Sequence, residues 1–216
     1  MNIQHSPLAK PDVLKMDGLC FVYPQRPLFS HLTLGIPAGV SLVLGGDGSG
    51  KTTLLQLLAG ALPAHAGELQ INGVSLKEAP NAYLAQVFWA DPRADDFDQI
   101  TPLDYFERLH LRYPRFNDPF LSNLTQGLAL GPHLHKPLYM LSTGSKRKVW
   151  LAGAFAAGAA VTLLDEPFAA LDKLSIGFAT ELLKDAAEHP KRTWVIAAYE
   201  APAAVPLASV IHLPAS

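Results

Sequence analysis

The stretch that decides the fold is Gly45-Gly46-Asp47-Gly48-Ser49-Gly50-Lys51-Thr52-Thr53. It matches the phosphate-loop pattern G-x-x-x-x-G-K-[ST] residue for residue. The apolar, strand-like residues 41–44 precede it and the leucine-rich residues 54–58 follow it. Strand, loop and helix therefore come in the order that the motif requires, and the sequence predicts a binding site for a nucleoside triphosphate.

The composition of this loop indicates how it would bind. Its glycines allow a tight turn in which successive N–H groups point at phosphate oxygens, and the following helix adds its N-terminal dipole. We expect Lys51 to reach the β- and γ-phosphate oxygens of ATP and the Thr52 hydroxyl to help coordinate Mg²⁺. Every residue from Gly45 to Thr53 is a candidate nucleotide contact, and Lys51 is also a candidate catalytic residue.

The composition fits a single globular domain of 216 residues, with 49% hydrophobic and 17% charged residues. A formal net charge of -2 gives no electrostatic support for nucleic-acid binding. Cys20 is the single cysteine, so an internal disulfide is impossible and the chain fits the cytosol. We expect the run Lys146-Arg147-Lys148 to be a solvated helix face.

The sequence shows no signal-peptide pattern and no stretch long enough to cross a membrane. Its most apolar segment, residues 149–164, is better interpreted as a buried helix that leads into a strand. We therefore expect any association with a membrane to come through a partner.

The pattern along the chain predicts an α/β domain. Before the loop, β-type runs at residues 19–23 and 32–36 indicate an antiparallel sheet, and residues 68–76 indicate a hairpin that turns at Asn72-Gly73. A further strand is expected over residues 83–88. The later segments predict a helix over 174–187 and strands over 161–164, 194–198 and 210–213, which is typical of a parallel sheet covered on both faces.

Between about residues 101 and 141, the pattern changes to short helical pieces. They are interrupted by Pro114, Pro119, Pro132 and Pro137. We interpret this segment as a helical subdomain inserted into one domain that spans residues 1–216. The core of that domain is then formed by about residues 1–100 and 142–216.

A second motif is the apolar strand at residues 161–164, which ends in Asp165-Glu166-Pro167. Adjacent side chains alternate in direction along a strand, so the two carboxylates can serve different ligands. Asp165 suits the coordination shell of Mg²⁺, and Glu166 suits a general base for the attacking water. Positioning and charge stabilisation by Lys51 and backbone donors supply the rest of the expected acceleration.

A third motif is Leu141-Ser142-Thr143-Gly144-Ser145, which precedes Asp165-Glu166 and has Ser142 as a candidate helix N-cap. Together with Phe168-Ala169-Ala170-Leu171-Asp172, it resembles the ATP-binding cassette (ABC) family, whose signature usually reads Leu-Ser-Gly-Gly-Gln and whose D-loop reads Leu-Asp. The resemblance covers nearly the whole chain. It implies the ABC type of P-loop fold, a mixed sheet with an antiparallel N-terminal β part and an inserted helical subdomain.

The resemblance also implies a head-to-tail dimer with another ABC ATPase, either a second copy or a related chain. In it, Ser142 and Gly144 contact the γ-phosphate held by the phosphate loop of the other subunit, and Asp172 relays between the two sites. Tyr23 matches the aromatic residue that stacks on adenine. Phe21 is the alternative for that role, and core packing is the alternative role for Tyr23.

The chain departs from the family pattern at several positions. Thr143 and Ser145 replace a glycine and the glutamine of the signature. Where the family has a glutamine that meets Mg²⁺ and senses the membrane partner, this chain has Trp89 or Ala90. Where the family has a histidine that donates to the γ-phosphate, it has Tyr199, which donates a hydrogen bond but carries no positive charge near neutral pH.

Other polar clusters have simpler interpretations. His133 and His135 are interpreted as loop residues rather than as a metal pair. The acidic run Asp95-Asp96-Phe97-Asp98 is interpreted as a solvated loop, with a Mg²⁺ or partner contact as the alternative.

The sequence thus favours the ATPase subunit of an ABC transporter. Such a subunit lies on the cytoplasmic face of the membrane, bound to a transmembrane permease, and its short length resembles the haem-exporter type. The alternative is a cassette that binds ATP and dimerises but hydrolyses slowly, as a regulatory or assembly switch. A DNA-repair ATPase is disfavoured because the chain lacks a long heptad insertion, and a P-loop kinase is disfavoured because it has no use for residues 141–145.

Overall fold

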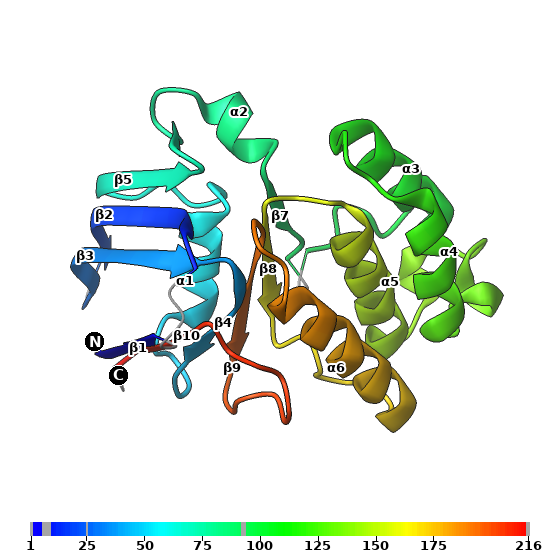
Figure 1. The fold of residues 1–216 in the computed structure, drawn as a ribbon. Helices are drawn as coiled ribbons and strands as arrows, with labels where there is room; N and C mark the ends of the chain where they lie inside the picture. The colour runs from blue at the N-terminus through cyan, green and yellow to red at the C-terminus, as the bar shows by residue number, and fades with distance from the viewer. Residues whose placement is uncertain (1, 6–9, 25, 92–93, 215–216) are drawn as a thin grey trace.

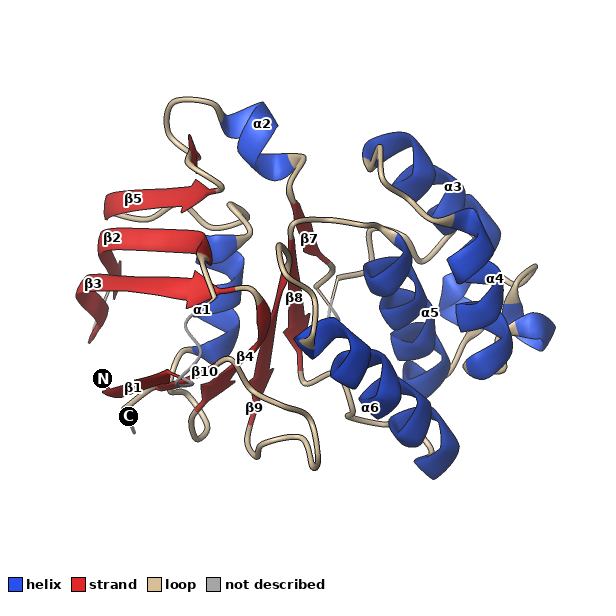
Figure 2. Cartoon of the chain, viewed as in Figure 1, coloured by secondary structure: helices blue, strands red, loops and turns tan. Residues whose placement is uncertain are grey.

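The computed structural model describes residues 2–5, 10–24, 26–91 and 94–214. A four-stranded sheet, a six-stranded sheet and a group of helices follow one another across the molecule (Figure 1). Figure 2 shows the same view with the strands in red and most of the helices on one side of the six-stranded sheet. Among the described residues, no helix combines the length and the apolar character needed to cross a membrane.

The four-stranded sheet is antiparallel and has the order β3-β2-β5-β6. Its strands are β2 (Asp12–Tyr23), β3 (Arg26–Pro37), β5 (Ala66–Ile71) and β6 (Val74–Ser75). Asn72 and Gly73 join the last two with φ angles of 51° and 78°, as a tight hairpin turn requires. The predicted antiparallel part and its hairpin are confirmed.

The six-stranded sheet has the order β1-β10-β4-β9-β8-β7. Its strands are β1 (Asn2–His5), β10 (Ser209–His212), β4 (Gly39–Leu44), β9 (Thr193–Ala198), β8 (Val161–Asp165) and β7 (Val87–Trp89). The strands from β10 to β7 pair in parallel, and β1 adds an antiparallel edge. The prediction of a mostly parallel sheet beside an antiparallel part is confirmed.

The parallel strands bring distant motifs to one edge of the sheet. In parallel strands, the carboxyl ends meet at the same edge, which is where open α/β sheets bind ligands. The phosphate loop follows β4, Asp165 and Glu166 come at the end of β8, and Tyr199 follows β9. Pairing of β4 with β9, and of β9 with β8, therefore assembles the candidate site.

Several of the helices begin at a residue whose side chain caps the first turn. The helices are α1 (Lys51–Leu58), α2 (Pro80–Leu84), α3 (Pro102–Arg112), α4 (Asp118–Gly127), α5 (Thr143–Ala156) and α6 (Lys173–Ala187), with short 3-10 helices at Gly131–His133 and Leu138–Met140. Thr101 starts α3 through a reciprocal capping box with Asp104. Ser142 caps α5 as predicted, by accepting a hydrogen bond from the Ser145 amide at 3.2 Å.

The core lies on both faces of the six-stranded sheet. On β4, Leu42 packs with the helices α3 to α6, whereas its neighbour Val43 packs with α1 and the antiparallel sheet. On β9, Ile196 likewise packs with the helices α3 to α6, and Val195 packs with α1 and the antiparallel sheet. This alternation follows from the two-residue period of a strand, so the strands under the site are fixed from both sides.

The predicted strand over residues 83–88 is wrong in its first half. Tyr83 belongs to α2, which Pro80 opens at its first turn, and the strand β7 begins only at Val87. The Tyr83 side chain is fully buried, and its hydroxyl donates to the Leu58 carbonyl at 2.7 Å. That tertiary contact holds the segment as a helical turn against α1.

Candidate functional site

A cavity of about 630 Å³ lies against the phosphate loop. Its lining includes Tyr23, the loop residues from Gly46 to Thr53, Asp165, Glu166 and Tyr199. These residues come from segments far apart in the sequence, and all were candidates from the sequence. Gly45 lies at the base of the loop, where its carbonyl accepts a hydrogen bond from the Lys51 ammonium.

The loop has the conformation that its glycines allow. Gly50 caps α1 with a φ of 95°, a region that residues with a side chain rarely adopt. A Cβ at this position would lie 2.8 Å from Leu28, so both the conformation and the space require glycine. The Lys51 side chain folds back over the loop, and Nζ donates to the carbonyls of Gly45 at 2.7 Å and Gly46 at 3.1 Å.

Two oxygen ligands of the kind that Mg²⁺ prefers lie together at the start of α1. The Thr52 hydroxyl donates to the Asp165 carboxylate at 2.7 Å, although the two residues are 113 positions apart. Mg²⁺ takes hard oxygen ligands and is commonly held by one or two protein groups plus phosphates and water. The pair Thr52 and Asp165 therefore fits Mg²⁺.

Glu166 lies beside this pair in a strained conformation. Its φ of 46° is in the left-handed region, and its Oε1 is buried without a hydrogen-bond partner among the described residues. Burial raises the pKa of the Glu166 carboxyl, and the nearby Lys51 ammonium partly opposes this shift. A carboxylate with a raised pKa next to a cavity is suited to accept a proton from a bound water.

Tyr199 lies over the phosphate loop from the end of β9. Its hydroxyl donates to the Asp47 carboxylate, and its ring lies over the Lys51 ammonium, with 3.8 Å between Nζ and the ring centroid. The hydrogen bond to Asp47 raises the pKa of the Tyr199 phenol. The phenol is therefore neutral near neutral pH and contacts the two loop side chains nearest to it.

Phe21 and Tyr23, near the end of β2, differ in exposure. Phe21 is 5% exposed and belongs to the core, whereas Tyr23 is 45% exposed and lines the cavity. The Tyr23 hydroxyl bonds the Thr53 hydroxyl at 3.0 Å, and the two aromatic rings meet edge to face at 5.0 Å. Tyr23 is therefore the better placed of the two to stack on a base, and Phe21 supports its ring.

Sequence reasoning missed Arg26 as a residue of this cavity. Its guanidinium donates to the Gly48 carbonyl at 3.0 Å from the start of β3. A basic residue just after the aromatic Tyr23 in the same turn is the signal that identifies it. Leu28, which packs on Gly50, carries no polar signal and is found only from the structure.

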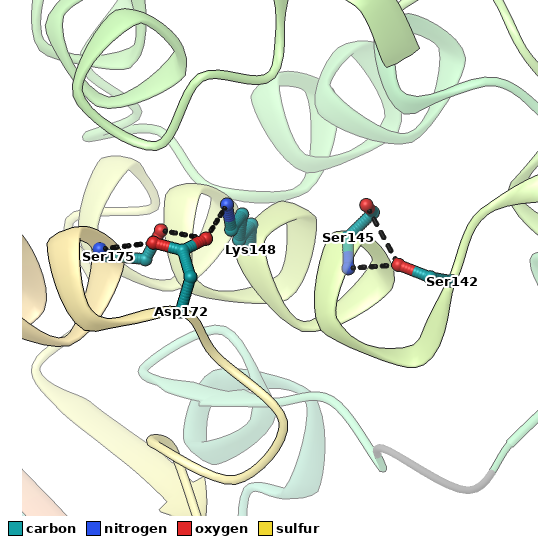
Figure 3. Close-up of polar contacts among 5 residues, drawn as sticks. All are labelled: Ser142, Ser145, Lys148, Asp172 and Ser175. Carbon is teal, nitrogen blue, oxygen red and sulfur yellow. Dashed lines mark hydrogen bonds and ion pairs between the residues drawn. The ribbon is translucent and has the colours of Figure 1, made fainter.

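Ser142 and Gly144 do not line the cavity of their own chain, because they open α5 at a different place. Figure 3 shows Ser142 at the start of this helix, bonded to the amide and the hydroxyl of Ser145. A Cβ at Gly144 would lie 2.3 Å from the Ala170 carbonyl oxygen. Glycine is therefore required here for packing within the chain, whatever else the residue contacts.

Asp172 is the N-cap of α6 and the partner of a lysine from α5. Its carboxylate accepts from the Ser175 amide at 2.9 Å and from the Lys148 ammonium at 2.6 Å (Figure 3). These contacts lower the pKa of Asp172, with the Lys148 bond as the largest cause. Asp172 therefore joins the first turn of α6 to α5.

The prediction that Lys146-Arg147-Lys148 is a solvated helix face is wrong. Lys146 pairs with Asp98 at 2.5 Å, and Lys148 pairs with Asp172. Arg147 is half-buried and donates from Nη1 to the Asp165 carbonyl at 3.1 Å and to the Glu166 carbonyl. Each of the three cations thus has its own acidic or carbonyl acceptors, because the helix is packed on several sides.

The interpretation of the acidic run as a solvated loop holds only for part of it. Asp95 and Asp96 are exposed, but Asp98 is paired with Lys146, and the Phe97 ring packs against Tyr105 and Trp150. This loop is thus attached to α5 through one ion pair and one aromatic cluster.

Trp89 or Ala90, where the family resemblance expects a glutamine, and the two histidines interpreted as loop residues also have a definite structure. Trp89 ends β7 and Ala90 follows it, and both are partly buried. His133 ends a 3-10 helix and His135 lies in the turn after it. Within the described part of the chain, no group of three or more His, Cys, Asp or Glu side chains is arranged to hold a metal.

The chain is similar in sequence and in fold to known proteins. The pattern of the family described as ABC transporter matches residues 29–169. A cytochrome c biogenesis ATP-binding export protein, CcmA, from Pseudomonas savastanoi pv. phaseolicola is 34% identical over 171 residues, which is 78% of this chain and 80% of that protein. A solved ATP-binding protein of an ABC transporter from Pyrococcus furiosus has a TM-score of 0.74 and 25% identity, over 93% of this chain and 96% of that chain.

A further solved structure has a similar fold. It is an ATP-binding cassette in a dimeric, post-hydrolysis state bound to ADP and Pi, with a TM-score of 0.71 and 20% identity. The match covers 87% of this chain and 88% of that chain. At this identity, the likeness concerns the fold alone.

Proposed function

The chain belongs to the ABC transporter family, as an ATP-binding subunit, and we propose that its cavity binds Mg-ATP and hydrolyses it to drive transport. The observation that carries this proposal is the convergence of Lys51, the Thr52–Asp165 pair and Glu166 on one cavity of about 630 Å³. ATP hydrolysis is the general activity of the family. The roles of the individual residues follow from their chemistry.

In the proposed complex, the adenine ring stacks on Tyr23 and the phosphates lie along the loop from Gly45 to Thr53. The loop N–H groups and the N-terminus of α1 favour an anion, and Lys51 exchanges its bonds to the loop carbonyls for phosphate oxygens. Thr52 and Asp165 would hold Mg²⁺, which would neutralise charge on the phosphate oxygens. Glu166 orients the attacking water and accepts its proton.

We propose that the site is completed by a second ABC ATPase subunit, either another copy of this chain or a related one. Ser142 and Gly144, at the N-terminus of α5, then contact the γ-phosphate across the interface, and Asp172 lies between the two sites. Their position away from the cavity of their own chain supports this arrangement. The dimeric, ADP-bound cassette with the same fold supports it further.

We propose that a transmembrane permease is the other partner and that the chain lies on the cytoplasmic face of the membrane. The helical segment from about residue 101 to 141 is the proposed docking part of an otherwise single domain. Its exposed apolar side chains, among them Leu103, Leu111, Tyr139 and Met140, support this role. The names of the curated relatives support export in cytochrome c biogenesis as the process served.

A second proposal concerns the rate. Tyr199 takes the place of a histidine and lies over Lys51 with its hydroxyl on Asp47. A neutral phenol supplies less charge stabilisation than an imidazolium, and loss of one preorganised donor typically costs ~10²–10³ in rate. This contact supports slow turnover, in which ATP binding and dimer closure act as a switch.

Steady-state phosphate release tests these proposals. The comparison is between the wild type and Glu166→Gln, with Glu181→Gln as a matched control on the exposed side of α6. We expect the Glu166 variant to lose hydrolysis, by at least about 10²-fold, while both variants still bind ATP. Phosphate release that does not depend on Glu166 would contradict the ATPase proposal and leave the binding proposal intact.

A further inference from the structure

Arg147 connects α5 to the end of the strand β8. Its Nη1 donates to two successive main-chain carbonyls, those of Asp165 at 3.1 Å and of Glu166. Both acceptors belong to the backbone, so the guanidinium holds the main chain of the turn that carries the two carboxylates. Arg147 is also one of the three residues for which the sequence predicted a solvated helix face.

The turn held by Arg147 needs external support. Glu166 has a φ of 46°, and a left-handed conformation costs a residue with a side chain ~1–3 kcal/mol. The Glu166 amide donates to the Ala197 carbonyl of β9 at 2.9 Å. The residue is therefore fixed on its amide side by the sheet and on its carbonyl side by Arg147.

Arg147 lies between α5 and the carboxylate turn. Together with Phe88, Trp150, Leu163 and Pro167, it lines a small cavity of about 30 Å³ behind this turn. Its two hydrogen bonds run directly from α5 to the main chain of the turn, so a displacement of α5 bears on the backbone at Asp165 and Glu166.

We propose that Arg147 is a positioning residue that sets the orientation of Glu166 and couples it to the N-terminus of α5. The helix that begins at Ser142 thereby links two places, the interface contact of Ser142 and Gly144 and the carboxylate turn of the same chain. Contact between the N-terminus of α5 and the nucleotide of the other subunit then changes the orientation of Glu166. This inference rests on the proposed function, because it assigns Glu166 and the α5 N-terminus the roles given above.

The test compares Arg147→Met, which keeps an unbranched stem of similar bulk, with Arg147→Lys, which keeps a cationic donor. We expect the methionine variant to lose kcat by about 10- to 100-fold with KM changed by less than about twofold, because Arg147 does not line the nucleotide cavity. The lysine variant should recover most of that loss. Lys146→Met is the matched control on the same helix, since it leaves both carbonyl bonds in place.

Amide hydrogen exchange provides a readout that does not depend on hydrolysis. We expect faster exchange over residues 165–171 in the methionine variant than in the wild type or the lysine variant, at equal melting temperatures. A methionine variant that matches the wild type in kcat and in exchange would overturn the proposal, as would a change in KM alone. If the wild type shows no Glu166-dependent phosphate release, the proposed function fails, and the exchange comparison still decides the role of Arg147.

Discussion

The ring of Tyr199 covers the ammonium of Lys51, 3.8 Å from its centroid, in the part of the loop where a phosphate is expected. A cation over an aromatic ring at a partly exposed site gains about 0.5–1 kcal/mol. In the proposed complex, a phosphate group takes the place of this ring at the Lys51 ammonium. Tyr199 therefore competes with the nucleotide for the same lysine.

Replacement of the phenol separates its effect on affinity from its effect on rate. In Tyr199→Ala, Lys51 is no longer covered, so we expect ATP affinity to rise about two- to fivefold, measured by isothermal titration calorimetry. In Tyr199→His, a ring donor that can be protonated is introduced, and kcat should rise by at least about tenfold. Unchanged ATP affinity in the alanine variant and unchanged kcat in the histidine variant would show that Tyr199 affects neither binding nor hydrolysis.

Lys51 is expected to be essential for nucleotide binding. Lys51→Ala removes the charge-assisted bonds to the phosphates, each worth ~1.5–3 kcal/mol, and should weaken ATP binding by at least about tenfold to a hundredfold. The matched control is Lys184→Ala. The ammonium of Lys184 in the wild type pairs with Glu181 on the exposed surface of α6. Retained ATP affinity in the Lys51 variant contradicts the assignment of the whole site.

Tyr23 is expected to contribute through its ring. Stacking of a base on an aromatic side chain is worth ~1–3 kcal/mol, so Tyr23→Ala should weaken ATP binding by about 5- to 150-fold. Tyr23→Phe keeps the ring, loses only the bond to Thr53, and should bind nearly as the wild type does. Equal affinities of the alanine and phenylalanine variants in the same titration would assign Tyr23 to packing alone.

Gly144 is expected to be required by the fold of its own chain. In Gly144→Ala, the added methyl group meets the Ala170 carbonyl, so the melting temperature should fall. Gly177→Ala is the matched control, because it lies within α6 with nothing within 4 Å of its Cβ, and it should stabilise the protein by about 0.5–1 kcal/mol. If Gly144→Ala melts as the wild type does, the packing argument is wrong.

The Lys148–Asp172 pair predicts a specific pH dependence of stability. The pKa of Asp172 is lowered in the folded state, so its contribution is fully present above the ordinary value of 3.8 and is lost as the pH falls through the folded value. The melting-temperature gap between the wild type and Asp172→Asn should therefore be constant near neutral pH and narrow in strong acid. A gap that widens as the pH falls would assign the pair a different role.

Most of the central sheet and the phosphate loop are predictable from the sequence, because they depend on local signals. The apolar runs at β8 and β9, the Asn72-Gly73 turn and the glycine pattern before Lys51 each specify their own backbone conformation. Ser142 as an N-cap belongs to the same class. In these cases, a few neighbouring residues are sufficient to fix the structure.

The parts that sequence reasoning missed depend on contacts with distant residues. Tyr83 looks like a strand residue, but its bond to Leu58 keeps it in a helical turn. Arg147 looks like one of three solvated cations, but from α5 it reaches the carbonyls of Asp165 and Glu166 at the end of β8. Arg26 reaches the phosphate loop because β3 begins beside it. The pairings of Tyr83 and Arg147 join residues far apart in the sequence, and no local pattern encodes them.

The position of β4 in the sheet has a consequence for synthesis of the chain. This strand carries the phosphate loop, and its two neighbours in the sheet, β9 and β10, span residues 193–198 and 209–212. A growing chain translated through the loop, α1 and even the carboxylate pair still has β4 unpaired on both edges. On the ribosome, the native pairing of β4 therefore forms only after β9 and β10 have been translated.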